Sequence, residues 1–198
     1  MSARARIGVL ALQGAFAAHC TMLERLGAPT REVRLPHDLE ECDALVMPGG
    51  ESTTMSKLLE TSQLFDPIAK RIADGMPIFG TCAGMILLAR DVLDGRDDQR
   101  SFDAIDIDVQ RNAYGRQVDS FETDIVLQGH ADLLHAVFIR APRIVRMGSG
   151  VTALAEHQDS PVLVRSTNVM AASFHPELTD DDRVHRMFLD LVTTAHEK

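Results

Sequence analysis

Cysteine is scarce in this chain, and its spacing disfavours two common structural uses. The three cysteines, Cys20, Cys42 and Cys82, are odd in number, and no two form a C-x-x-C pair. A disulfide framework and a cysteine zinc site are therefore disfavoured, and no H-E-x-x-H or clustered Cys/His motif offers another metal site. We expect no metal ion, no cofactor and a reducing, cytoplasmic location.

A surplus of positive charge and a long hydrophobic run are also missing. The formal net charge is -9, so there is no basic excess to neutralise phosphates, and we expect no nucleic-acid partner. The apolar run 7–12 is broken by Gln13 and Gly14. It is short for a signal-peptide core and far too short to span a bilayer, so we expect a buried first strand and no membrane association.

The order of apolar segments predicts an α/β fold. The 198 residues are enough for one hydrophobic core, and we expect a single domain over 1–198. In the first part, strand-like and helix-like segments alternate, the strands at 6–12, 30–35, 44–47 and 77–79 and the helices at 15–26, 52–60, 63–74 and from 85 to 89 onward. Such alternation indicates parallel βαβ units with helices on both faces of a sheet.

The second part of the chain has a different pattern. Ile105, Ile107 and Val109 alternate with aspartates, which is typical of a strand with one buried face. A polar loop is expected at 95–101. Further strand-like runs follow at 121–127, 135–140, 151–156, 161–165 and 169–174. An amphipathic helix is then expected at 181–195. We predict a three-layer, mostly parallel, doubly wound sheet with an added antiparallel portion.

The segment GTCAG, residues 80–84, places Cys82 between small residues at a strand-to-helix corner. Such a corner forces its central residue into strained backbone geometry and needs small neighbours. At the start of a helix, backbone N–H groups favour a negatively charged sulfur, and the N–H of Ala83 can hold a developing oxyanion. This pattern indicates a nucleophile. The alternative is a buried core cysteine, which is how we interpret Cys20 and Cys42.

A base for that thiol is indicated by FHPEL, where His175 follows an apolar strand. Pro176 restricts His175 to extended geometry, in which side chains at i and i+2 point the same way. We therefore expect Glu177 to lie beside the imidazole and to fix its tautomer. The alternative is a strand end with a proline turn and a solvated glutamate.

A glycine-rich turn, PGGES at 48–52, follows another predicted strand, and LQG at 12–14 follows the first. Strand ends of a parallel sheet share one edge, so these turns should converge on the corner at Cys82. PGGEST lacks the lysine and the spacing of a Walker motif, but its glycines free N–H groups to face an anion or oxyanion. The alternative is a plain turn in which Ser52 or Thr53 caps the next helix.

Together, GTCAG, PGG and HPE resemble the nucleophile elbow, oxyanion strand and histidine-glutamate pair of class I (triad) glutamine amidotransferases. Within that group the chain is similar to the glutaminase subunits of pyridoxal 5'-phosphate synthases. The similar segments run from residue 12 to residue 178: LQG, PGGESTT, GTCAGMILLA, RNAYGRQVDSFE (111–122), FIRAP (138–142) and SFHPEL (173–178). RNAYGRQ and FIRAP are the specific ones, since the triad motifs fit many amidotransferases.

The resemblance implies a role for each of these residues. Cys82 would attack the carboxamide of glutamine, His175 would carry protons, and Glu177 would orient His175. The oxyanion hole would be formed by the backbone around Gly49, Gly50 and Ala83, with Gln13 helping to order it at a partner interface. Glutamine itself would be held by Gly50, Glu51, Ser52, Arg111, Ile139 and Arg140. For the two arginines, surface salt bridges are the alternative.

The family partner implied is a (β/α)8-barrel synthase subunit in a larger hetero-oligomer, which would receive ammonia directly. One residue departs from the pattern, because Ala18 stands before His19 where many members carry an acidic residue. Two alternatives stay open: a glutaminase subunit of another pathway, such as histidine biosynthesis, and a non-catalytic regulatory module of the same fold.

Overall fold

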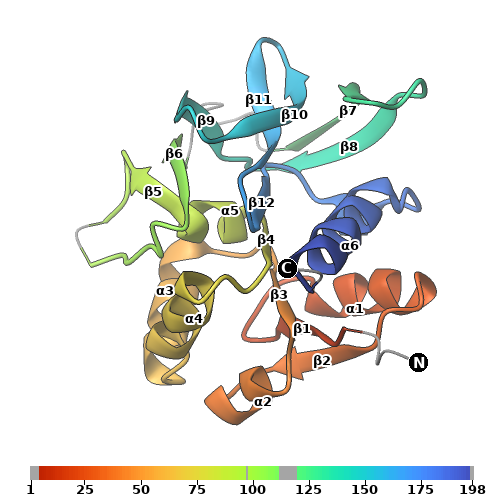
Figure 1. The fold of residues 1–198 in the computed structure, drawn as a ribbon. Coiled ribbons are helices and arrows are strands. Elements are labelled where there is room, and N and C mark those ends of the chain that lie inside the picture. Colours follow the sequence, from red (N-terminus) through yellow and green to blue (C-terminus); the bar gives the residue numbers. More distant parts are fainter. Residues whose placement is uncertain (1–4, 97, 112–119, 197–198) are drawn as a thin grey trace.

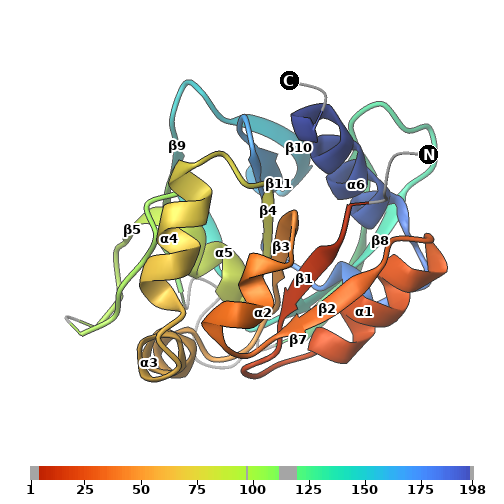
Figure 2. The ribbon, with the colours of Figure 1, turned by 60° about the horizontal axis from the view of Figure 1, so that its bottom comes forward.

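A nine-stranded mixed sheet forms the centre of the computed structural model, which describes residues 5–96, 98–111 and 120–196. Helices α3, α4 and α5 lie on one side of the sheet, and α1 and α6 on the other (Figures 1 and 2). The fold therefore has three layers, as predicted. No helix in the described ranges is long and apolar enough to cross a membrane.

One part of the sheet is parallel. Its strands lie in the order β2-β1-β3-β4-β12 and comprise β1 (Ile7–Leu10), β2 (Thr30–Val33), β3 (Ala44–Met47), β4 (Ile78–Thr81) and β12 (Val169–Ala172). Every residue of β1, β3, β4 and β12 is buried. This is typical of parallel strands covered on both faces, and it explains why they read as continuous apolar runs.

The other part is antiparallel and continues from β12 in the order β11-β10-β7-β8. Its strands are β11 (Ser160–Arg165), β10 (Thr152–His157), β7 (Ser120–Leu127) and β8 (Leu134–Ile139). A separate three-stranded sheet consists of β5 (Ala89–Val92), β6 (Ile105–Gln110) and β9 (Arg143–Met147). In β6 the isoleucines and Val109 are buried and the aspartates are half-buried, as their alternation predicts.

Two hydrophobic cores flank the main sheet. On one side, Met55, Leu59 and Ile68 pack from α3 (Ser52–Thr61) and α4 (Phe65–Ala73), beside α5 (Ala83–Leu88). On the other side, Leu23 and Phe188 pack from α1 (Phe16–Arg25) and α6 (Arg183–His196). These cores fix the ends of β4 and β12, where the chemistry-bearing residues lie.

Several local predictions need correction. The helix expected to begin at 85–89 starts at Ala83 and ends at Leu88, because Ala89 already belongs to β5. Three elements were not predicted: α2 (Pro36–Glu40), β5 and β9. The predicted loop at 95–101 has no helix or strand in its described residues. Of the motif at 111–122, residues 112–119 lie outside the described ranges.

Candidate active site

Cys82 occupies the sharp corner between β4 and α5. Its backbone has φ 50° and ψ -106°, a conformation that a residue with a side chain rarely adopts. Its N–H donates to the carbonyl of Ala172 at 2.8 Å, which ties the corner to β12. A Cβ at Gly84 would lie 2.0 Å from the carbonyl oxygen of Met47. This glycine, two residues after Cys82, is therefore needed for the close approach of α5 to β3.

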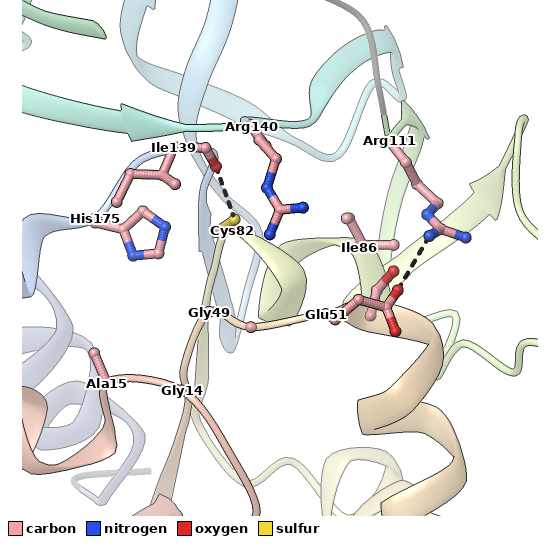
Figure 3. A pocket seen from close by; sticks show the side chains of 12 residues that line it. Gly14, Ala15, Gly49, Glu51, Cys82, Ile86, Arg111, Ile139, Arg140 and His175 are labelled. Atoms are coloured by element: carbon pink, nitrogen blue, oxygen red, sulfur yellow. Dashed lines mark hydrogen bonds and ion pairs between the residues drawn. The ribbon is translucent and has the colours of Figure 1, made fainter. Parts of the chain in front are cut away.

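His175 lies beside Cys82 at the end of the segment that follows β12 (Figure 3). Its Nδ1 is 2.7 Å from Oε1 of Glu177, and its backbone N–H donates to Val137 at 2.8 Å. The predicted contact is present, but the predicted geometry is wrong. Strand β12 ends at Ala172, and Glu177 lies in the short 3-10 turn η1 (Pro176–Leu178) rather than in extended chain.

The charges of His175 and Glu177 are set by their surroundings. Burial opposes a charge on His175, but hydrogen bonds with Cys82 and Glu177 outweigh it and raise its pKa to about 10. Burial likewise opposes a charge on Glu177, yet the hydrogen bond from His175 and the positive charge of that histidine keep its pKa below the usual value. At neutral pH the site therefore contains an imidazolium paired with a carboxylate.

The loop after β3 is packed tightly against this pair. A Cβ at Gly49 would lie 2.5 Å from Cε1 of His175 and 3.3 Å from Cβ of Cys82. Gln13 fastens the same loop, since its Nε2 donates to the carbonyl of Glu51 at 2.7 Å and lies against Gly50. Ala83 is the first residue of α5, so its N–H belongs to the turn that has no intrahelical acceptor.

A pocket of about 240 Å³ opens over Cys82 (Figure 3). Nine of the residues proposed from the sequence line it: Gly49, Gly50, Glu51, Ser52, Cys82, Arg111, Ile139, Arg140 and His175. Gln13, Ala83 and Glu177 are not in its lining. Three further residues line the pocket: Gly14 of the LQG turn, which was expected to converge on Cys82, Ile86 of the segment GTCAGMILLA, and Ala15, which no sequence pattern had pointed to.

Glu51 and Arg111 pair at the end of the pocket away from His175 (Figure 3). The guanidinium Nη2 of Arg111 is 3.2 Å from Oε1 of Glu51, and its Nη1 donates to Gln99 at 2.9 Å. Glu51 also caps α3, accepting from the backbone N–H groups of Thr53 and Thr54 at 3.0 and 2.7 Å. The alternative, in which Ser52 or Thr53 caps this helix, is therefore wrong.

The charge of Glu51 is stabilised by these donors. Partial burial opposes ionisation, but the hydrogen bonds from Thr54 and Thr53 lower its pKa to about 2. The carboxylate is thus ionised at any physiological pH and faces the pocket as a fixed negative charge.

Arg140 supplies a positive charge on the β8 side of the same pocket. It follows β8 with φ 43°, an unfavourable backbone conformation for arginine, and its side chain is exposed. It makes no ion pair with any residue of the described ranges. The preceding residue, Ile139, turns its carbonyl toward Sγ of Cys82 at 3.8 Å (Figure 3). Within the described ranges, then, no surface salt bridge holds Arg140, while Arg111 pairs inside the pocket.

Known proteins share both this chain's sequence and its fold. The model of the SNO glutamine amidotransferase family matches residues 9–194. A curated relative from Salinispora tropica, "Pyridoxal 5'-phosphate synthase subunit PdxT", is 54% identical over 96% of this chain and 97% of its own length. A relative of the same name from Thermosipho africanus is 51% identical over 94% and 98%.

The chain belongs to the SNO glutamine amidotransferase family.

Solved structures agree with this membership. A crystal structure described as a glutamine amidotransferase superposes with a TM-score of 0.88 at 48% identity, covering 94% of this chain and 98% of the other. A protein from Thermoplasma acidophilum, described as part of a GMP synthase, has a TM-score of 0.70 at 17% identity, covering 100% and 98%, and therefore shares the fold. The predicted fold class is thus confirmed.

Two polar residues of this amidotransferase site were missed in the sequence. Gln99 orients Arg111 from the loop before β6, and His19 on α1 places its Nε2 3.4 Å from Oε2 of Glu177. Gln99 stands in a polar run with no periodicity. His19 stands one residue after Ala18, and only that departure from the family pattern had drawn attention there.

Proposed function

We propose that this chain is a glutaminase, which hydrolyses L-glutamine to L-glutamate and ammonia through a cysteine thioester. The observation that carries the proposal is the constellation at the pocket floor: a strained Cys82 at a helix start, with His175 beside it and Glu177 held 2.7 Å from that histidine. Membership of a glutamine amidotransferase family supports the same reaction.

The first half of the reaction forms the thioester. Cys82 passes its thiol proton to His175, its sulfur attacks the side-chain carbonyl carbon of glutamine, and the carbonyl oxygen becomes negative. Backbone N–H groups around Gly50 and Ala83 are the candidates to stabilise that oxyanion. The imidazolium of His175 then gives its proton to the leaving nitrogen, so that ammonia departs as the carbon–nitrogen bond breaks.

The second half regenerates the thiol. Neutral His175 removes a proton from water, the resulting hydroxide attacks the thioester, and the carbon–sulfur bond breaks to release glutamate. Glu177 stabilises the imidazolium and keeps its Nδ1 hydrogen-bonded, so that Nε2 is the nitrogen available for both proton transfers.

The remaining pocket charges suit the α-amino acid end of glutamine. Glu51 is the candidate partner of the ammonium group, and Arg140 and Arg111 are the candidate partners of the carboxylate. Ser52 and the backbone of Ile139 complete the wall on either side.

The ammonia acceptor is inferred from the relatives. Those from Salinispora tropica and Thermosipho africanus are named as subunits of pyridoxal 5'-phosphate synthase. We infer that this chain passes ammonia to a (β/α)8-barrel synthase subunit in a hetero-oligomer, for pyridoxal 5'-phosphate synthesis. Direct transfer is required because ammonia released into neutral water becomes ammonium, which is not nucleophilic. Gln13, whose Nε2 donates to the Glu51 carbonyl, is the candidate link between that partner and the loop of Gly49 and Gly50 that would help to form the oxyanion hole.

The test is ammonia release from glutamine by the wild type and by Cys82→Ala, each with and without the barrel subunit. We expect the wild type to be active, the partner to raise its rate, and Cys82→Ala to be inactive in both conditions. A wild type that is silent in both would contradict the proposal and favour a regulatory module. Activation by the barrel subunit of another pathway in place of this one would favour a different amidotransferase.

A further inference from the structure

A cluster of buried polar side chains lies behind Glu177 and has no part in the mechanism above. It consists of His19 from α1, Thr81 at the end of β4 and His185 from α6, and each is fully buried. Buried polar groups of this kind are kept only where they are hydrogen-bonded. Their contacts lead directly to the triad.

The contacts form a chain from α6 to the carboxylate. Nε2 of His185 is 2.9 Å from Nδ1 of His19. Nε2 of His19 is 3.4 Å from Oε2 of Glu177 and 3.3 Å from Oγ1 of Thr81. The other oxygen, Oε1, is the one that binds His175. Among the described residues, Oε2 of Glu177 has no hydrogen-bond partner, so its 3.4 Å contact with Nε2 of His19 is an electrostatic one.

The two tautomers of His19 differ in what Nε2 offers: a bare Nε2 can accept only from the hydroxyl of Thr81, whereas a protonated Nε2 also suits the nearby carboxylate of Glu177. If Nδ1 of His19 carried the proton, its bare Nε2 would face the carboxylate, and two lone pairs would repel in a dry interior. If instead Nε2–H of His185 donates to Nδ1 of His19, the proton of His19 lies on Nε2 and faces Oε2. In this arrangement Nδ1 of His185 carries no proton. It has no hydrogen-bond partner among the described residues, so no buried N–H group is left without an acceptor there.

We infer that His19 is a positioning residue for Glu177: His185 holds it in the Nε2–H tautomer, and this N–H orients the carboxylate whose other oxygen binds His175. The inference rests on the glutaminase function proposed above. In this arrangement, His19 on α1 and His185 on α6 position Glu177 from the side of the triad that faces away from the pocket.

The charge states agree with this arrangement. Burial lowers the pKa of His19, opposed by Glu177 and aided by His175. Burial also lowers the pKa of His185 to about 3, aided by His19 and Arg25 and opposed by Glu177 and Asp182. Both histidines are therefore neutral at neutral pH. Because His19 is neutral, it can donate to the Glu177 carboxylate without forming an ion pair of its own. A protonated His19 would instead compete with His175 for the charge of Glu177.

The activity test compares two substitutions of His19 in the complex with the barrel subunit. His19→Met fills similar space without a donor, whereas the amide of His19→Gln can place an N–H near the position of Nε2. We expect kcat of His19→Met to fall roughly 10- to 100-fold with KM within about twofold, and His19→Gln to retain most of the activity.

The pH dependence of kcat gives a second readout. Its acid limb should move to higher pH in His19→Met alone, because Glu177 loses a group that donates to its charged form. His37→Gln, at a largely exposed histidine, is the control.

Each outcome has a distinct meaning. A folded His19→Met with wild-type kcat and pH profile would overturn the inference while leaving the glutaminase function intact. A wild type that releases no ammonia would instead overturn the proposed function.

Nitrogen-15 spectra of the wild-type histidine rings, assigned through the backbone, test the inference without activity or substitution. They should show His19 protonated at Nε2 and bare at Nδ1. The opposite tautomer would refute the inference even if the His19 variants fail to fold.

Discussion

The two ends of the pocket hold their charges in opposite ways. At the triad end, Glu177 is 6% exposed, is hydrogen-bonded to His175 and lies against His19 behind it. At the other end the Glu51 side chain is 45% exposed and is held by the first turn of α3 and by Arg111. The buried carboxylate is closed off from solvent, whereas the open one is free to exchange partners. We therefore propose that the same residue type serves chemistry at one end and recognition at the other.

The largest effect that this comparison predicts is on kcat at the buried end. Glu177→Gln removes the charge that stabilises the His175 imidazolium, and we expect kcat for glutamine to fall by roughly a thousandfold with little change in KM. Glu51→Gln is the matched substitution at the open end and should act mainly on KM. Steady-state kinetics of both variants check this, and equal losses of kcat would show that the two ends are not distinct.

At the open end, Arg140 tests recognition directly. Arg140 lines the pocket and has no ion-pair partner among the described residues, and we propose a substrate carboxylate as its partner. We expect Arg140→Met to raise KM by roughly 10-fold or more, since a hydrogen bond to a charged group contributes about 1.5–3 kcal/mol. Arg165→Met, at an exposed arginine outside the pocket lining, is the control. An unchanged KM would remove Arg140 from the site.

The rigidity of the buried end can be tested through stability. A Cβ at Gly84 would meet the backbone of Met47, so Gly84→Ala should lower the free energy of unfolding by about 1–3 kcal/mol. At Gly150 nothing lies within 4 Å of the added Cβ, so Gly150→Ala should change the free energy of unfolding by less than about 0.5 kcal/mol. Urea unfolding midpoints distinguish the two. Equal midpoints would mean that the corner can relax.

The smallest effect concerns acid stability. The pKa of His185 is lowered to about 3 in the folded chain, whereas the unfolded chain takes up that proton near pH 6.5. The unfolded state therefore binds more protons below pH 6.5, and the stability falls as the pH drops from 6.5 toward 3, by up to about 1.4 kcal/mol per unit. Urea unfolding at pH 7 and pH 5.5 should show a flatter dependence for His185→Gln. His37→Gln is the control, and identical slopes for all three proteins would contradict the assignment.

The corner at Cys82 was predictable because its determinants are local. An apolar strand, small residues on both sides of the thiol and an apolar helix follow one another within a dozen positions. The structure adds the backbone angles of Cys82 and the reason for Gly84, which is the approach of Met47. The His175–Glu177 contact was predicted correctly from a wrong geometry, since an i, i+2 pair can also meet through a 3-10 turn.

Elements with a weak pattern were not predictable. Strand β9 reads RIVRM, and only Ile144 in it is buried, so it shows neither alternation nor an apolar run. Its place is decided by pairing with β6, whose Asp108 forms an ion pair with Arg146. The five-residue helix α2 is likewise too short to establish a helical period.

By itself, the sequence determined the parallel strands, the strained corner and the adjacency of His175 and Glu177, because each follows from neighbours along the chain. Only the tertiary structure decided which distant groups meet: Glu51 with Arg111, and His19 with His185 across 166 positions. The reason is physical. Backbone conformation and hydrophobic periodicity are local and leave a trace in the sequence, whereas a buried hydrogen bond between two helices depends on how the sheet brings them together.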